Sequence, residues 1–292
     1  MNCLSAPRLH PVEQRSHLSA PQLRSCVRLL TSWTLIALLL FGWVPRARAD
    51  AMPVRYVQGS FHGFLELRSE GGSVVASGDS LQFVHGDRIT AETIFRFKDG
   101  SVDDETTVYT QHRTFHLISD HHVQKGPSFP HPMDVLIDTV SGNVTVHSTD
   151  KDGKEEVKTD HMTLPEDLAN GLIPVVVQNM QAAQQGTTVE MVVMAPKPRV
   201  VKLEISNLGE ENCSVVDVAT KATHYEIKIV LGGAIGLIAP LVGKAPPNIQ
   251  VWVIRGKAPT FAREQGPLYA EGPMMTIQLA SPVWPAAAMA GN

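Results

Sequence analysis

The chain has 292 residues, three cysteines and a formal net charge of −4, and only 6% of its residues are aromatic. Residues 1–49 contain six of the 25 Lys and Arg and one of the 29 Asp and Glu, so the remainder carries 19 against 28 and a net charge of −9. Phosphate binding depends on clustered Lys and Arg, so this acidic remainder excludes nucleic acid as a partner. Cys213 is the one cysteine left, which excludes an intramolecular disulfide.

Residues 28–50 have the pattern of a secretory signal peptide. A basic flank precedes an apolar run at 33–44, and Ala47-Arg48-Ala49 supplies a small-x-small exit. An apolar run of about a dozen residues is well short of the roughly 20 that cross a bilayer as a helix. We therefore predict cleavage before Asp50, a periplasmic or secreted bacterial protein, and no membrane-spanning segment after cleavage.

Residues 54–162 predict antiparallel strands. Apolar and polar side chains alternate there, and turn signals such as Gly71-Gly72, Gly86-Asp87 and Asp99-Gly100 separate the runs. The predicted strands cover residues 60–67, 80–85, 88–97, 106–119, 134–138, 144–148 and 155–162.

Residues 163–184 break this pattern and predict a helix. Thr163-Leu164-Pro165-Glu166 resembles a capping box with a proline early in the first turn. Apolar residues then follow at helical spacing, which is typical of one buried stripe. They are Leu168, Leu172, Val175, Val176 and Met180. Asn170-Gly171 and Pro174 weaken the middle, so we expect a kink or two short helices.

Strands resume after the helix. The sequence has no repeat of fixed period. They are predicted at residues 187–194, 199–206, 214–219, 224–231, 249–255 and 274–279. The predicted fold class is mainly β, a curved antiparallel sheet forming a half-barrel or barrel-like meander with one kinked helical insertion. We predict a signal peptide at 1–49, a single β-rich domain at 50–282, which allows subhalves meeting near 185–198, and a flexible tail at 283–292.

The ionisable residues predict neither a metal site nor a cofactor. On one strand, His112 and His116 would share a face about 13–14 Å apart, too far to bind one ion. Neither His-Glu-x-x-His nor a paired Cys-x-x-Cys occurs. The acidic stretch 99–105 is typical of a hairpin turn. Ser128 lacks the Gly-x-Ser-x-Gly pattern of an activated nucleophile, so no catalytic residue is predicted and a protein without enzymatic activity is favoured.

The apolar, glycine-rich segment 231–244 suggests two alternatives. Six residues lie between Gly236 and Gly243-Lys244, whereas a phosphate loop has four. Its apolar side chains must be covered, either by ordinary core packing or by a ligand at the lip of a cavity. On the second alternative, the residues that line the ligand site are Leu172, Val176, Met180, Ile235, Leu237, Ile238, Leu241 and Trp252.

Several motifs resemble those of uncharacterised exported β-rich bacterial proteins. They are Gly126-Pro-Ser-Phe-Pro130, Leu164-Pro-Glu-Asp-Leu-Ala-Asn-Gly171, Ala239-Pro-Leu-Val-Gly-Lys244 with Pro246-Pro247 and Val251-Trp-Val253, and Glu264-Gln-Gly-Pro-Leu-Tyr269. More distantly, the long meander with one helical insertion is similar to the half-barrels of periplasmic lipoprotein carriers. That resemblance implies a concave sheet that shelters acyl chains, and it transfers no ligand-binding residue.

Three functions follow from these patterns. The first is an exported, non-enzymatic β-rich protein that binds an apolar or amphipathic ligand, such as a lipid or a lipidated protein. The second is a structural or protein-interaction module of the cell envelope without a small-molecule site. The third, which the motifs favour least, is an exported metal-dependent hydrolase that uses the acidic and histidine residues.

Overall fold

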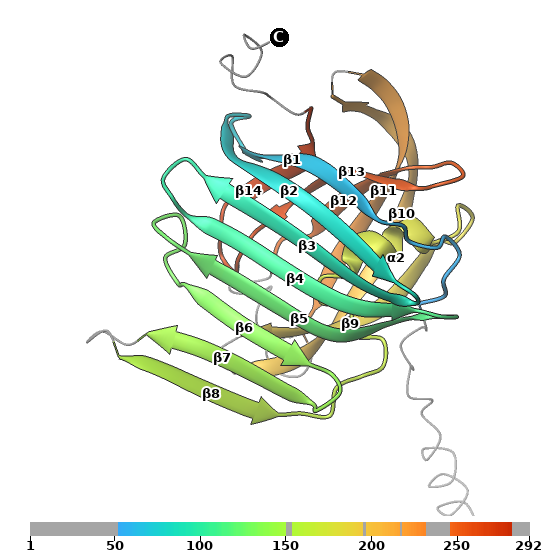
Figure 1. Cartoon of the computed structure of the whole chain (residues 1–292). Helices are drawn as coiled ribbons and strands as arrows, with labels where there is room; N and C mark the ends of the chain where they lie inside the picture. Colours follow the sequence, from blue (N-terminus) through green and yellow to red (C-terminus); the bar gives the residue numbers. More distant parts are fainter. Residues whose placement is uncertain (1–51, 150–153, 195–196, 217, 232–245, 282–292) are drawn as a thin grey trace, which may run out of the picture. The chain divides into compact units, whose positions relative to one another are not determined.

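A computed structural model describes residues 52–149, 154–194, 197–216, 218–231 and 246–281. They belong to one compact unit, Ala49–Asn292. The predicted signal peptide, flexible tail and most of the glycine-rich segment lie outside the described residues. The elements are β1 (Phe61–Ser69), β2 (Val74–His85), β3 (Arg88–Phe97), β4 (Val102–Gln111), β5 (Phe115–Lys125), β6 (Met133–Asp138), β7 (Asn143–Thr149), β8 (Glu155–His161), α2 (Ile173–Asn179), β9 (Gly186–Met194), β10 (Pro198–Val215), β11 (Val218–Val230), β12 (Ile249–Ile254), β13 (Thr260–Pro267) and β14 (Met274–Leu279), drawn in Figure 1.

All fourteen of these strands form one antiparallel sheet. Each strand pairs with the next strand in the chain, except that β8 does not pair with β9. In addition, the first strand, β1, pairs with the last, β14. The pairing of β1 with β14 therefore joins the first eight strands to the last six. Since β8 and β9 are edges, the curved sheet does not close into a barrel. The predicted fold class, a mainly β protein with a curved antiparallel sheet and a helical insertion, is confirmed.

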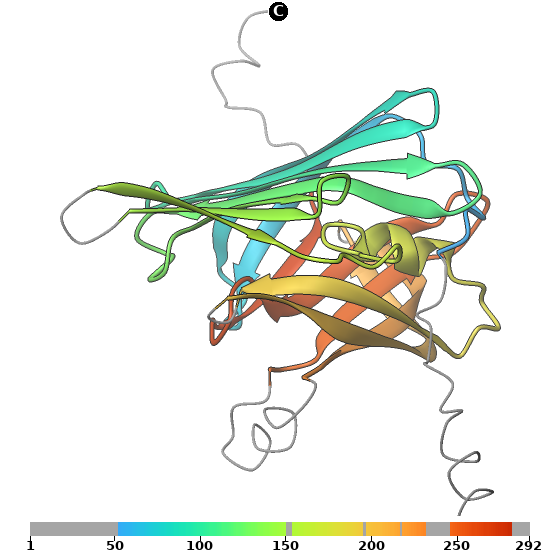
Figure 2. The same cartoon turned by 90° about the horizontal axis from the view of Figure 1, so that it is seen from below.

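Helix α2 lies between the two parts of this sheet, as Figure 2 shows. It contacts β12 and β13. Its buried valines belong to the largest hydrophobic cluster, which takes side chains from both parts of the sheet. Fully buried members include Ile89, Tyr109, Leu172, Leu203 and Val251. The helix therefore fills much of the sheet's interior with apolar side chains, each of which stabilises the fold by about 1.5–3 kcal/mol when fully buried.

The helix is shorter than predicted. It covers Ile173–Asn179, whereas the prediction covered 163–184. Pro174 lies in its first turn, where a missing backbone N–H breaks no hydrogen bond, so the proline begins the helix instead of bending it. The part of the chain before the helix makes backbone contacts with β9. The Ala169 N–H donates to the Glu190 carbonyl at 2.7 Å.

Residues 167–171 lie along part of the β9 edge. Leu168 forms a parallel bridge with Glu190. The Asn170 side chain bonds Val192 twice: its Nδ2 donates to the carbonyl at 3.0 Å, and its Oδ1 accepts from the N–H at 2.8 Å. We call residues 167–171 the closing segment, because they occupy the edge that the sheet leaves open. At the other edge, all seven residues of β8 are exposed.

The predicted strand at 106–119 is wrong, because the structure has a hairpin there. Strand β4 ends at Gln111 and β5 begins at Phe115. His112 lies in the turn and His116 on β5, so the two do not share one strand face as predicted. The acidic stretch predicted as a turn also differs, since Asp103 and Glu105 lie within β4.

Candidate binding site beside the helix

The C-terminal end of α2 is held by an arginine from the turn after β12. The Arg255 guanidinium donates to the carbonyls of Val177 at 3.3 Å, Gln178 at 3.1 Å and Met180 at 3.0 Å. It also lies over the Tyr225 ring, 5.3 Å from the centroid. These carbonyls end the helix without partners inside it, and a cation there also interacts favourably with the helix dipole. Arg255 therefore caps α2.

The chain that precedes β1 is attached to the same end of α2. Asn179 Oδ1 accepts hydrogen bonds from the backbone N–H groups of Arg55 at 3.0 Å and Tyr56 at 2.8 Å. Arg55 Nη1 donates in turn to the Asn179 carbonyl at 2.8 Å. Residues far apart in the sequence are thus brought together around Asn179, which is itself buried.

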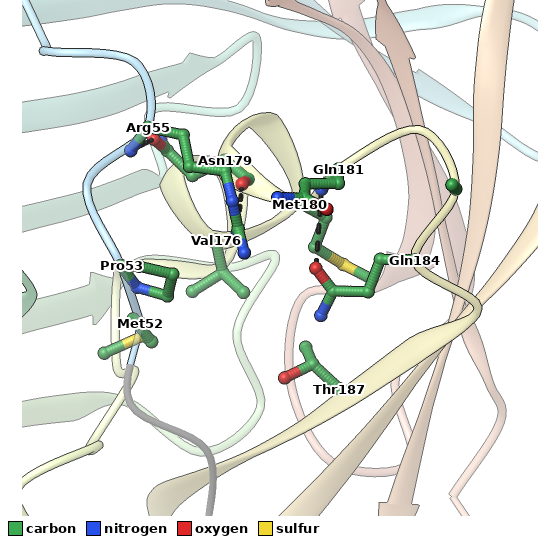
Figure 3. A pocket seen from close by; sticks show the side chains of 10 residues that line it. Met52, Pro53, Arg55, Val176, Asn179, Met180, Gln181, Gln184 and Thr187 are labelled. Carbon is green, nitrogen blue, oxygen red and sulfur yellow. Dashed lines mark hydrogen bonds between the residues drawn. The ribbon is translucent and has the colours of Figure 1, made fainter.

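A pocket of about 470 Å³ lies where these two segments meet, and Figure 3 shows it. Ligand sites for single small molecules commonly measure about 300–1,000 Å³. Its lining residues are Met52, Pro53, Arg55, Val176, Asn179, Met180, Gln181, Ala183, Gln184 and Thr187. They come from the segment before β1, from α2 and the loop after it, and from the start of β9.

The lining has an apolar part and a polar part. Met52, Val176 and Met180 are buried side chains that also belong to the main hydrophobic cluster. Arg55 is exposed and brings a positive charge to the same pocket. Gln184 Oε1 accepts from the backbone N–H of Gln181 at 3.4 Å on the other side of the pocket, as Figure 3 shows. The arrangement can hold a molecule that has an apolar part and an anionic or hydrogen-bonding end.

The structure brings Val176 and Met180 of the predicted ligand-lining set into this pocket. Leu172 is fully buried in the main cluster and is not among the pocket residues. Trp252 lies in a separate cluster with Cys213 and Ala222. The other predicted residues, Ile235, Leu237, Ile238 and Leu241, lie outside the described residues.

Trp252 already has partners on both faces and at its indole nitrogen. His224 stacks on it with a centroid distance of 4.4 Å, and the Arg263 guanidinium carbon lies 4.0 Å from the ring centroid. Its indole N–H donates to Glu211. Its neighbours Val251 and Val253 belong to the main cluster, so alternation along β12 places Trp252 on the other face of the sheet.

A second group of side chains within the sheet is ionisable. Asp103 and Glu105 come from β4, Asp120 and His122 from β5, and Glu264 from β13. We call these five residues the acid cluster. Asp103 and Asp120 are buried, while the other three keep partial exposure. Glu264 influences the ionisation of Glu105. The cluster therefore links strands from the two parts of the sheet.

Hydrogen bonds fix part of this cluster. His122 Nε2 lies 2.7 Å from Asp103 Oδ1. Gln124 Nε2 donates to Asp103 Oδ2 at 3.2 Å, and the Thr107 hydroxyl donates to Asp120 Oδ1 at 2.8 Å. Each aspartate in the interior thus has a polar partner, which reduces the cost of burying it.

The environment of the acid cluster favours bound protons. Burial, with the charge of Glu105 acting in the same direction, raises the pKa of Asp120 to about 8. Burial also raises the pKa of Glu105 and brings the pKa of Glu264 to about 7. Burial opposes the protonated form of His122, but its hydrogen bond to Asp103 and the charge of Glu105 outweigh this and raise its pKa to about 9. Several protons are therefore retained near neutral pH.

Sequence reasoning missed most of both groups. Met52, Arg55 and Asn179 reach the pocket through contacts between distant segments, and nothing local in the sequence indicates this. The acid cluster did carry a signal, because Asp103 and Glu105 are spaced by two, as are Asp120 and His122. Spacing by two places side chains on one face of a strand. The first pair falls within residues 99–105, where a hairpin turn is predicted.

Among the described residues, no three His, Cys, Asp or Glu side chains are arranged to hold a metal ion. No helix within the described ranges is long and apolar enough to cross a membrane.

The fold and pocket define an open, barrel-like antiparallel sheet with an internal helix and a small-molecule-sized pocket at the helix end. A similar solved structure is the crystal structure of a β-barrel-like protein of the domain of unknown function DUF1849 from Brucella abortus. It is 10% identical, the match covers 77% of this chain and 98% of that chain, and the TM-score is 0.43. No family model matches the chain, and no curated protein matches it. The predicted similarity to lipoprotein carriers stays a prediction.

Proposed function

We propose that this chain is an exported, non-enzymatic binding protein whose pocket beside α2 takes one amphipathic, anionic molecule such as a fatty acid or another single-chain lipid. The observation that carries this proposal is the composition of the pocket. Met52, Val176 and Met180 offer apolar contact, while the exposed Arg55 offers a positive charge at the same opening. A carboxylate or phosphate end would pair with the guanidinium, and the apolar chain would leave water.

The energetics support a modest affinity. Burial of about 300–400 Å² of ligand and pocket apolar surface contributes about 8–10 kcal/mol at 25 cal/mol per Å². Loss of translational and rotational freedom costs about 4 kcal/mol or more. A difference of about 4–6 kcal/mol corresponds to a dissociation constant between about 1 mM and about 40 μM.

The acid cluster limits where a chain could run. An acyl chain that continued from the pocket into the middle of the sheet would meet Asp103, Glu105 and Glu264, whose polar groups would lose solvent without gaining hydrogen bonds. We therefore place the ligand at the end of α2 and not across the whole concave face.

Export is part of the proposal, and the sequence of residues 28–50 supports it. A periplasmic location also agrees with a mature chain that keeps only Cys213 and needs no disulfide. Amino-terminal sequencing of the protein from its host should find Asp50 first. A retained apolar run at 33–44 in membrane-embedded protein would contradict export in this form.

A binding titration with a fluorescent fatty acid tests the proposal. Arg55→Gln should weaken binding about three- to tenfold, because one charge-assisted contact is lost. Ala183→Trp should abolish binding, because Ala183 is exposed at the pocket and a large ring there fills it without entering the core. Arg96→Gln is the matched control, since Arg96 is 58% exposed and pairs with Asp79 away from the pocket.

A second function is favoured by the filled interior. Helix α2 and the main cluster occupy the space that an acyl carrier would leave open. A structural or protein-interaction module of the cell envelope would need only this packed fold. If the wild type binds no fatty acid up to the solubility limit, and Ala183→Trp leaves all properties unchanged, this second function replaces the first.

A further inference from the structure

The closing segment rests directly on the acid cluster. At Gly171 the backbone has φ +66°, and a Cβ built there would lie 1.9 Å from Thr107 Oγ1 and 2.7 Å from Asp120 Oδ1. The segment's backbone thus lies against the Thr107–Asp120 hydrogen bond, with no room for a side chain between them. Any movement of Asp120 changes the surface on which the segment packs.

On its other side, the closing segment makes a few polar contacts with β9. It is held to β9 by the Ala169 N–H to Glu190 bond at 2.7 Å and by the two bonds between Asn170 and Val192. A further bond, from the Glu190 N–H to the Asp167 carbonyl, measures 3.4 Å. Leu168 and Ala169 of the segment are buried in the main hydrophobic cluster, so the segment opens only when charge that develops beneath it outweighs this packing.

The charged groups around Asp120 come from every element that packs there. Those of β4 and β5 are Asp103, Glu105, His121 and His122, and that of β13 is Glu264. The closing segment and β9 carry Asp167 and Glu190. Carboxyl groups outnumber histidines in this set. Proton loss therefore adds like charge beneath the segment, which favours separation of the packed surfaces.

We propose that the closing segment is a proton-controlled closure, packed on the acid cluster while Asp120 is neutral and released from it when Asp120 and its neighbours lose their protons. Release frees the β9 edge and loosens the chain that leads into α2. The device belongs to the fold and does not depend on whether the pocket binds a ligand.

The pH direction follows from the environment of these groups. The pKa of Asp120 is raised to about 8 by burial, and that of Glu264 to about 7, both above the values of an unfolded chain. A raised pKa stabilises the closed form fully below the unfolded-chain pKa, and that stabilisation is lost as the pH rises through the raised value. The pKa of His122, raised to about 9 against its ordinary 6.5, acts in the same direction at higher pH. Closure is therefore strongest in mild acid and weakest near pH 9.

Amide hydrogen exchange of the whole protein tests this, with rates corrected for the intrinsic effect of pH. Between a pH of about 6 and a pH of about 9, protection of residues 167–171 should fall about tenfold or more. Protection of β12 should stay within about twofold, which separates local release from global unfolding. Equal protection of the closing segment at both pH values would overturn the proposal.

Two variants sharpen the test. Asp120→Asn keeps an acceptor for Thr107 but cannot ionise, so it should abolish the pH dependence of segment protection. Glu264→Gln removes an ionisable group from the other part of the sheet and should reduce the pH dependence of segment protection. This variant keeps the test informative if Asp120→Asn does not fold. Asp79→Asn is the matched control, because Asp79 is 28% exposed and pairs with His62 and Arg96, neither of which belongs to the groups around Asp120. A loss of the pH dependence in Asp79→Asn, or its retention in both cluster variants, would contradict the mechanism.

Discussion

The two edges of the sheet are protected in different ways. Strand β8 is exposed at all seven positions and carries charged residues such as Glu156, Lys158 and Asp160. Strand β9 is covered by the closing segment, which also packs on the acid cluster. Charge on an exposed edge discourages pairing with other chains, whereas a covered edge depends on a tertiary contact. Substitutions near β9 should therefore lower the free energy of unfolding by an amount that depends on pH, whereas substitutions on β8 should leave it nearly unchanged.

The largest effect is expected at Gly171. Replacing it by Val inserts a Cβ into Thr107 and Asp120 and forces a β-branched residue to adopt φ +66°, so unfolding should become easier by about 3–5 kcal/mol. Gly86→Ala is the control for backbone strain alone, because Gly86 has φ +64° and nothing within 4 Å of its Cβ. Urea denaturation should show a loss of only about 1–2 kcal/mol for Gly86→Ala. Equal losses in the two variants would mean that the closing segment is not packed as described.

The next effect is on the pH dependence of stability. As pH rises from about 5 to about 9, the raised pKa values of Asp120 and Glu264 predict a loss of at least about 2 kcal/mol. Denaturation curves at several pH values measure it. Asp120→Asn should flatten this dependence, and a wild type that is most stable near pH 9 would contradict the sign.

A smaller effect is expected where α2 is capped. Arg255→Met keeps much of the side-chain volume but removes the donors to the carbonyls of Val177, Gln178 and Met180, and should cost about 1–3 kcal/mol. Arg96→Gln should change stability by less than about 1 kcal/mol, because its ion pair with Asp79 is solvent-exposed. Thermal unfolding of the two variants gives the comparison. A similar melting temperature for both would remove Arg255 from the account.

The smallest effect is expected on the exposed edge. Val157 on β8 is 58% exposed, so Val157→Thr should change the free energy of unfolding by no more than about 0.5 kcal/mol. Thr188→Val gives the same exchange in reverse on β9, where the residue is partly buried. A large loss at Val157, measured by urea denaturation, would show that another part of the protein covers β8.

The alternation of side chains predicted most strands, while tertiary contacts decided the rest. The turn between β4 and β5 contains no glycine or proline, so 106–119 appeared continuous, and β13 (Thr260–Pro267) was not predicted. The helical pattern at 163–184 yielded to β9, whose edge pairs with residues that would otherwise begin a helix.

The candidate sites were less accessible to prediction than the fold. Helical spacing predicted Val176 and Met180, because Val176 lies in α2, Met180 follows its last residue, and both are buried. Arg55 and Met52 join them only because Asn179 binds the chain before β1. Glu264 faces Glu105 from a strand far along the sequence. Such long-range neighbours leave no local pattern in a single sequence.

Methionine methyl NMR tests ligand binding beside α2 most directly. Met52 and Met180 line this pocket, whereas Met275 lines a smaller pocket of about 200 Å³ with Phe97, Phe129 and Tyr269. On titration with dodecanoate, the account predicts saturable shifts of the Met52 and Met180 methyl signals and an unchanged Met275 signal. Shifts confined to Met275, or no shift of any of the three up to the solubility limit, would contradict it.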